Sequence, residues 1–101
     1  MNYRWAWSAL FLLGAGCGGP PQLGAVKENH GAVDALFTAL TSRRPALLDQ
    51  SAGRLQRLRA TGTLPEAAAA RLDAIVAKAQ RGEWEPAARD LADFMSGQRW
   101  D

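Results

Sequence analysis

Cysteine, histidine and tyrosine are scarce in this chain of 101 residues, which has one of each. A single cysteine has no partner for an intramolecular disulfide. One histidine and one cysteine are too few for the three or four converging ligands of a typical zinc site. Basic residues (12) and acidic residues (10) nearly balance, so the net charge gives no support to nucleic-acid binding. We therefore expect no cofactor, no metal site and no nucleic-acid partner.

Long hydrophobic runs are also missing. The longest apolar stretch, near the N-terminus, has about 12 residues before Gly18-Gly19-Pro20-Pro21, whereas a transmembrane helix needs about 20. Residues 1–16 instead have the layout of a secretory signal, with Arg4, the apolar stretch 5–13 and small residues up to Gly16. The sequence therefore predicts export without a permanent membrane span.

The stretch Leu13-Gly14-Ala15-Gly16-Cys17 resembles the lipobox of bacterial lipoproteins, although Gly14 stands where that family usually has leucine. The resemblance implies that residues 1–16 are removed and that Cys17 receives lipid and becomes the mature N-terminus. Gly18 stands where the inner-membrane retention signal has aspartate, which favours the outer membrane over the inner one.

Two other interpretations of this N-terminus remain open. One is a plain signal peptide cleaved near Ala15. The other is a buried N-terminal helix of a cytosolic protein, in which Cys17 is an ordinary small hydrophobic residue. Large apolar side chains all around that helix leave it no polar face, which disfavours the cytosolic interpretation; they are Trp5, Trp7, Leu10, Phe11, Leu12 and Leu13.

The rest of the chain predicts an all-α fold. Residues 17–25 form the lipidated cysteine and a flexible Gly/Pro tether, and residues 26–101 form a helical domain. Apolar residues recur at helical spacing over 26–42, from Pro45 to a left-handed cap at Gly62, from 63 to Gly82, and over 83–95. Short connections make these segments a small four-helix domain of two αα-hairpins.

The apolar positions of these helices predict the core, with Val26 and Val33 on the inner face of the first helix. The core residues are Leu36, Phe37, Leu40, Leu48, Leu55, Leu58, Leu72, Ile75, Val76, Trp84, Leu91 and Phe94. Thr63 and Glu66 have the spacing of a capping box that opens the third helix. We expect His30 to be exposed in the first turn of the first helix, and Trp84 to be a core anchor rather than the lining of a groove.

The charges are unevenly distributed along the chain. The segment 43–59 contains five arginines, and the segment 83–101 contains five acids. We expect two solvated faces that attract each other, in preference to a basic face for anionic lipid headgroups. The residues are Arg43, Arg44, Arg54, Arg57 and Arg59, and Glu83, Glu85, Asp90, Asp93 and Asp101.

A second resemblance covers part of the helical domain. The segment 55–58 through 62–65, then Arg71-Leu72, Ile75-Val76, Gly82 and Trp84 with Ala87, is similar to the C-terminal helical domain of steroid receptor RNA activator protein. This similarity implies a helix-bundle interaction module without enzymatic activity, and it carries over no binding residues.

These features together predict a membrane-anchored envelope lipoprotein whose domain faces the periplasm. We expect a non-enzymatic module that binds a protein partner, because the chain lacks a credible set of acid, base and nucleophile. The alternative is a small-ligand or lipid binder that uses the groove between the hairpins and the arginines of 43–59. The predicted site residue is Cys17, as the point of lipid attachment.

Overall fold

The computed structural model of the chain describes residues 19–99, which form four α-helices without a β-strand. The helices are α2 (Lys27–Ser42), α3 (Pro45–Ala60), α4 (Glu66–Gln80) and α5 (Trp84–Ser96). Their bounds lie within three residues of those expected from the apolar periodicity. The predicted all-α fold class is therefore confirmed for this part of the chain.

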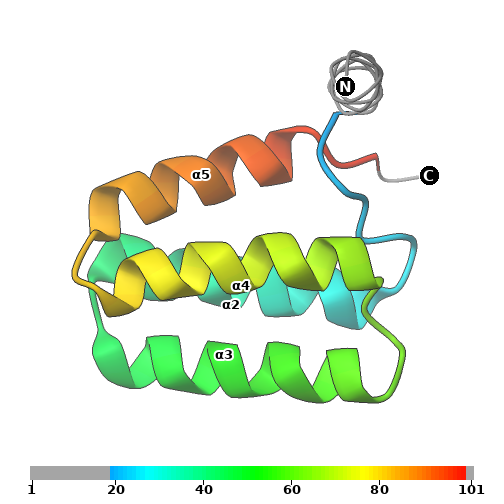
Figure 1. Cartoon of the computed structure of the whole chain (residues 1–101), viewed down its shortest axis with the longest axis horizontal. Coiled ribbons are helices and arrows are strands. Elements are labelled where there is room, and N and C mark those ends of the chain that lie inside the picture. The colour runs from blue at the N-terminus through cyan, green and yellow to red at the C-terminus, as the bar shows by residue number, and fades with distance from the viewer. Residues whose placement is uncertain (1–18, 100–101) are drawn as a thin grey trace, which may run out of the picture.

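Successive helices run in opposite directions and pair as two hairpins, α2–α3 and α4–α5 (Figure 1). The hairpins join along two seams, where α2 packs on α5 and α3 packs on α4. The segment before α2, the α3–α4 loop and the segment after α5 lie at one end of the bundle, here called the terminal end (Figure 1). The α2–α3 and α4–α5 turns lie at the opposite end, here called the distal end.

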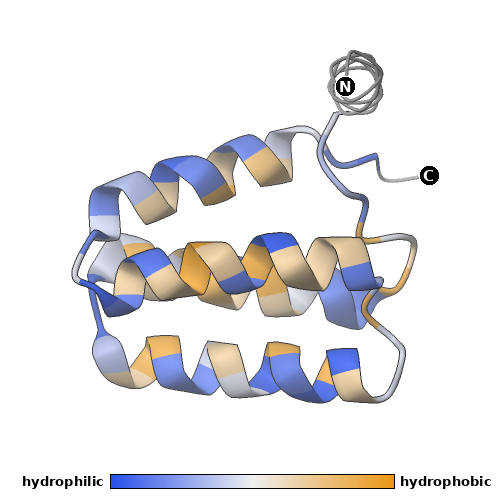
Figure 2. Cartoon of the chain, viewed as in Figure 1, coloured by the Kyte–Doolittle hydropathy of each residue, from blue (hydrophilic) through white to orange (hydrophobic). Residues whose placement is uncertain are grey.

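The core is continuous through all four helices, and Figure 2 shows hydrophobic residues along most of α4, which packs on both α3 and α5. Ten of the twelve predicted core residues are buried, while Phe37 and Trp84 are half-buried and pack against that core. Two leucines outside the helices, Leu23 and Leu64, complete it with 1% and 3% exposure. The sequence pattern did not predict these two, because neither belongs to a helical repeat.

Val26 is not on the inner face of the first helix, contrary to expectation. It is the extended residue that precedes α2 (φ −75°, ψ 116°) and keeps 42% of its surface exposed. A residue outside the helix does not follow the helical period, so its spacing from Val33 is uninformative.

Three helix ends close in the same way. After α3, Thr63 N–H donates to Leu58 O (2.9 Å) and Gly62 N–H to Arg59 O (3.1 Å), which is the Schellman pattern. The end of α4 repeats it with Gly82 in the left-handed position (φ 86°), as expected for a helix that stops at glycine. The end of α2 repeats it with an arginine there.

Arg43 is that arginine, with φ 52°. Its N–H donates to Leu40 O (3.3 Å), and the N–H of Arg44 donates to Ala39 O (3.2 Å). A side chain with a Cβ pays about 1–2 kcal/mol for this conformation. The distal turn between α2 and α3 therefore holds a strained residue.

The capping box predicted at the start of the third helix is wrong. Helix α4 begins at Glu66 with Pro65 as its N-cap, and no side chain caps it. Thr63 therefore lies two residues too early, and its hydroxyl pairs with that of Thr61 (2.9 Å). Glu66 turns instead toward Arg59, since two charge-assisted hydrogen bonds outweigh one bond to a backbone N–H.

The flexible tether predicted for residues 17–25 is also wrong for its described part. Residues 20–24 pack on the helices rather than hang free, since Leu23 is buried in the core and Pro20 lies against Gly97. The contact with Gly97 is so close that a Cβ at that position would overlap the proline ring. The folded domain therefore begins about six residues earlier than the sequence indicated.

Replacing Arg43 by glycine should stabilise the protein. The substitution removes about 1–2 kcal/mol of left-handed strain and adds about 0.5–1 kcal/mol of entropy loss on folding, so we expect the free energy of unfolding to rise by about 0.5–1 kcal/mol. Thermal or denaturant unfolding measures this change. Arg43→Ala, which removes the charge but keeps a Cβ, should give no such gain. An equal gain in both variants would trace the effect to charge instead of strain.

Candidate functional site

Cys17, the predicted lipidation site, lies outside the described residues. The structure does describe the chain that follows it, and two glutamines, Gln22 and Gln98, fix this segment to the C-terminal end of the domain (Figure 1). We call the pair the glutamine clamp. Its contacts fix the position of residues 20–23 on the C-terminal end of the helical domain.

Gln98 binds the backbone of the N-terminal segment from both sides. Its Oε1 accepts a hydrogen bond from Leu23 N–H (2.7 Å), and its Nε2 donates to Pro21 O (2.8 Å). The same Nε2 also donates to Phe94 O in the last turn of α5 (3.1 Å). Gln98 is only 9% exposed, so these bonds are shielded from water.

Gln22 binds the backbone of the C-terminal segment in the same way, through one accepted and one donated hydrogen bond. Its Oε1 accepts from Arg99 N–H (2.9 Å), and its Nε2 donates to Gly97 O (3.0 Å) and to Pro20 O (3.1 Å). Each glutamine side chain therefore binds the backbone of the residues immediately before and after the other glutamine. The two chain ends are held together although 75 residues separate them in sequence.

Asn29 ties the same segment to a third part of the chain. It is fully buried in the first turn of α2, and its Nδ2 donates to Leu23 O and to Thr63 O, both at 3.0 Å. Its Oδ1 has no hydrogen-bond partner among the described residues. The two carbonyl acceptors nevertheless fix the orientation of the amide, since its oxygen could not bind them.

His30 is buried, with 8% exposure, and the expectation that it is exposed is wrong. Its Nε2 lies 2.7 Å from Gly24 O, so the ring packs beneath the segment that precedes α2. The backbone of residues 21–24 is therefore bound by Asn29, His30 and Gln98. Isolated polar residues of this kind carry no sequence pattern, and sequence reasoning missed Gln22, Asn29 and Gln98.

The five arginines of 43–59 do not form one face that attracts the C-terminal acids. Arg43 and Arg44 are exposed at the distal end, whereas Arg59 near the terminal end pairs with Glu66 and Asp73 of α4. The C-terminal acids find other partners, since Asp90 pairs with Lys78, Glu83 with Arg81 and Glu85 with Arg89. The expected attraction between the two segments is therefore wrong for the described ion pairs.

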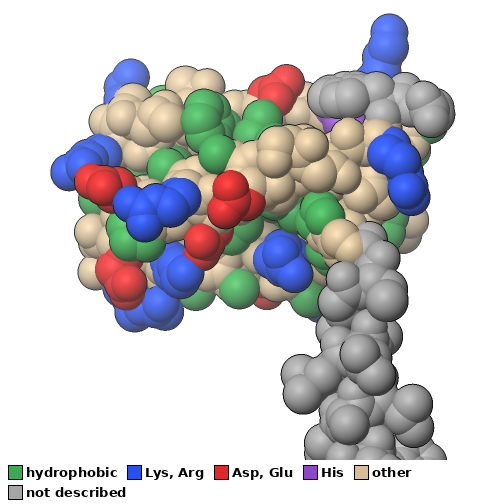
Figure 3. Space-filling view, turned by 90° about the horizontal axis from the view of Figure 1, so that it is seen from above, with side chains coloured by type: hydrophobic (Ala, Val, Ile, Leu, Met, Phe, Trp, Pro, Cys, Tyr) green, Lys and Arg blue, Asp and Glu red, His purple; other side chains and the backbone are tan. Residues whose placement is uncertain are grey.

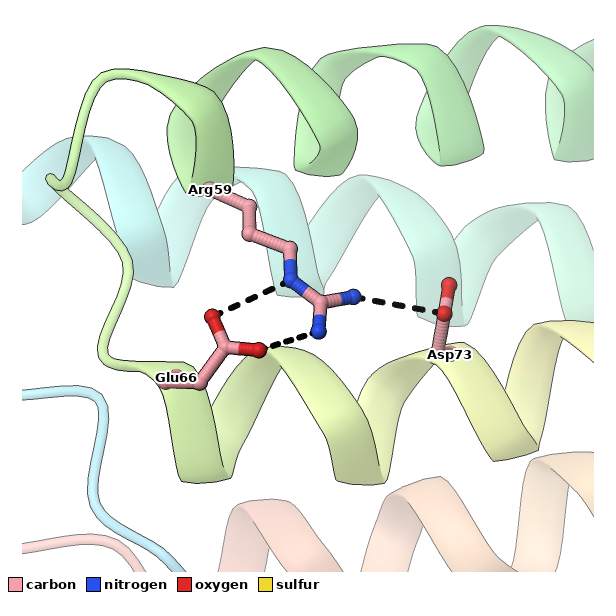
Figure 4. Close-up of polar contacts among 3 residues, drawn as sticks. All are labelled: Arg59, Glu66 and Asp73. Carbon is pink, nitrogen blue, oxygen red and sulfur yellow. Dashed lines mark hydrogen bonds and ion pairs between the residues drawn. The ribbon is translucent and has the colours of Figure 1, made fainter.

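Arg59 spans the seam between the hairpins. Its Nε donates to Glu66 Oε2 (3.1 Å), its Nη2 to Glu66 Oε1, and its Nη1 to Asp73 Oδ2 (3.4 Å) (Figure 4). The hydrogen bonds and charge of Glu66 raise the pKa of Arg59. In return, the hydrogen bonds from Arg59 hold the pKa of the Glu66 carboxyl below its usual value, assisted by the arginine's charge.

The seam beneath Arg59 is filled by the protein's own side chains. Leu55, Leu64 and Val76 line a hollow there whose free volume is about 10 Å³, roughly the space that one water molecule needs. This hollow is too small for a ligand. An open hollow of about 480 Å³ is instead lined by Arg54 and Arg57 of the arginine segment, together with Glu28, Leu58, Thr61 and Thr63. Trp84, the other residue considered for a groove, is half-buried and packs against the core at the start of α5.

Two features are absent from the described part of the chain. Within residues 19–99, no group of three or more histidine, cysteine, aspartate or glutamate side chains could hold a metal ion. None of the four helices there is both long and apolar enough to span a bilayer.

The Glu66 carboxyl should titrate below its ordinary pKa, and Arg59→Gln should raise that pKa toward the ordinary value. Because the folded-state pKa is lowered, the pair's contribution to stability is present above the unfolded pKa and is lost as the pH falls through the folded one. An NMR titration of the side-chain carboxyl measures the shift. Arg57→Gln, at an exposed arginine two residues away, should leave it in place. An equal pKa in wild type and Arg59→Gln would show that the ion pair does not form.

Comparisons of the chain with known protein families, curated sequences and solved structures found no match.

Proposed function

We propose that this protein is a bacterial envelope lipoprotein, anchored by lipid on Cys17, whose helical domain binds a protein partner and performs no catalysis. The observation that carries the proposal is the stretch Leu13-Gly14-Ala15-Gly16-Cys17, placed immediately ahead of a folded helical domain. A signal of this type is read by residue size before the cysteine, and both preceding residues are small. Lipidation also gives the lone cysteine a role in an oxidising compartment, where it has no disulfide partner.

The packing of the domain supports a binding surface in preference to an internal ligand site. Apolar side chains from all four helices pack on one another. The seam between α3 and α4 is closed by Arg59 above a hollow of about 10 Å³. A partner would therefore bind outer faces of the helices, which carry charged side chains of both signs (Figure 3).

The proposal also includes a location. Gly18, rather than aspartate, follows Cys17, so we place the protein at the outer membrane with the domain in the periplasm. The lipid supplies the membrane contact, and the helices supply the contact with the protein partner.

Labelling of bacteria with a radioactive fatty acid tests the anchor. The wild-type protein should incorporate label, and Cys17→Ser should not, since serine has no sulfur to form the thioether. Gly16→Ala, which keeps a small residue before the cysteine, should retain the label. An unlabelled wild-type protein would contradict the lipoprotein assignment.

The same labelled cells test the binding function. After crosslinking of intact envelopes, the wild-type protein should be recovered in a reproducible complex with another protein. Recovery with bound lipid but without a protein partner would reject the interaction module in favour of the lipid-binding alternative.

A further inference from the structure

We infer that the terminal end of the bundle is a membrane-contact surface, at which Val26, Lys27 and Arg99 lie against the headgroups of an anionic bilayer. The inference rests on the proposed lipid on Cys17. It adds which end of the domain meets the bilayer and which side chains contact it.

The chain between the lipid and the domain is short. Cys17 precedes Pro20 by three residues, and three extended residues span at most about 11 Å. By contrast, α2 has 16 residues and is about 24 Å long. An anchor at Cys17 therefore brings the terminal end to the bilayer, and the distal end lies beyond its reach unless the domain lies on its side.

The glutamine clamp prevents the chain from lengthening that reach. Leu23 is buried, and the backbone on either side of Gln22 is held by Gln98, while Gln22 itself holds Gly97 and Arg99. Without these contacts, residues 20–25 would join the tether and make it about three times as long. With them, the C-terminal segment is also held close to the membrane.

The side chains at this end suit a lipid surface. Val26, directly before α2, is the large apolar residue that stays exposed within residues 19–99. Lys27 follows Val26 in the chain, and the backbone N–H of Arg99 binds Gln22. Both basic side chains are exposed, and neither takes part in an ion pair of the described residues. Figure 3 shows basic side chains at this end. Glu28 is an exposed acid next to Lys27.

Charge alone does not select the terminal end, because Arg43 and Arg44 are exposed at the distal end. The short reach and the exposed apolar side chain select it. An amphipathic surface of this kind places its apolar residue at the headgroup boundary and its basic residues on anionic headgroups. The occupant of this surface is therefore the bilayer that carries the anchor.

Site-directed fluorescence in vesicles containing phosphatidylglycerol tests the orientation. Ala25→Cys and Ala46→Cys place a thiol at exposed alanines of the terminal and distal ends, and each is the sole free thiol because lipidation converts that of Cys17 to a thioether. Each full-length lipidated protein is labelled with a small fluorophore and exposed to nitroxide-labelled lipid. Quenching should be several-fold greater at position 25 than at position 46. Equal or reversed quenching would overturn the inference.

Mass spectrometry of each labelled sample first establishes the lipid on Cys17. Absence of that lipid would overturn the proposed function, and this inference with it, whereas equal quenching of a lipidated protein would overturn the orientation alone. Lys27→Gln with Arg99→Gln should lower the quenching at position 25 in anionic vesicles, whereas Arg43→Gln with Arg44→Gln should not. An unchanged signal in the first double variant would reject the headgroup contact.

Discussion

The reciprocal bonds between Gln22 and Gln98 hold the two ends of the domain together, and the structure of its terminal end depends on them. Each side chain binds backbone groups on both sides of the other. An intramolecular hydrogen bond contributes about 0.5–1.5 kcal/mol net, whereas a buried polar group left without a partner costs about 1–3 kcal/mol. Removal of either glutamine side chain would therefore leave at least two backbone groups without their hydrogen-bond partner. The clamp also keeps Leu23 in the core, beside helices that form from distant parts of the sequence.

The two ends of the bundle are held by different means. At the distal end, the α2–α3 and α4–α5 turns close through local Schellman bonds, one of them at a strained Arg43. At the terminal end, the Schellman closure after α3 is joined by long-range contacts, and Asn29 links the N-terminal segment to Thr63 in the α3–α4 loop. Three chain segments thus meet around buried amides at the end where the proposed anchor enters. A domain tethered there has its most connected end closest to the membrane.

The difference between local and long-range contacts also explains what the sequence could predict. The helices follow from apolar spacing, and the left-handed ends at Gly62 and Gly82 follow from the conformational freedom of glycine. Arg59 pairs with two carboxylates of α4, and residue spacing in the sequence does not predict these partners. The same spacing wrongly predicted a capping box at Thr63. The prolines and glycines of the N-terminal segment predict a flexible tether. The structure shows otherwise because Gln98, 75 residues after Leu23, binds this segment. The buried state of His30 depends on the same docked segment.

The proposed membrane contact depends most directly on the order of residues 20–24, since that order would set the distance between the proposed lipid and the helices. Hydrogen exchange of the Leu23 backbone amide, followed by NMR, measures this order at the bond to Gln98 Oε1. The account predicts an amide that exchanges far more slowly than that of exposed Gly24, with protection comparable to amides in the helices. Leu23 and Gly24 amides that exchange equally fast, at the rate of an unstructured chain, would contradict it.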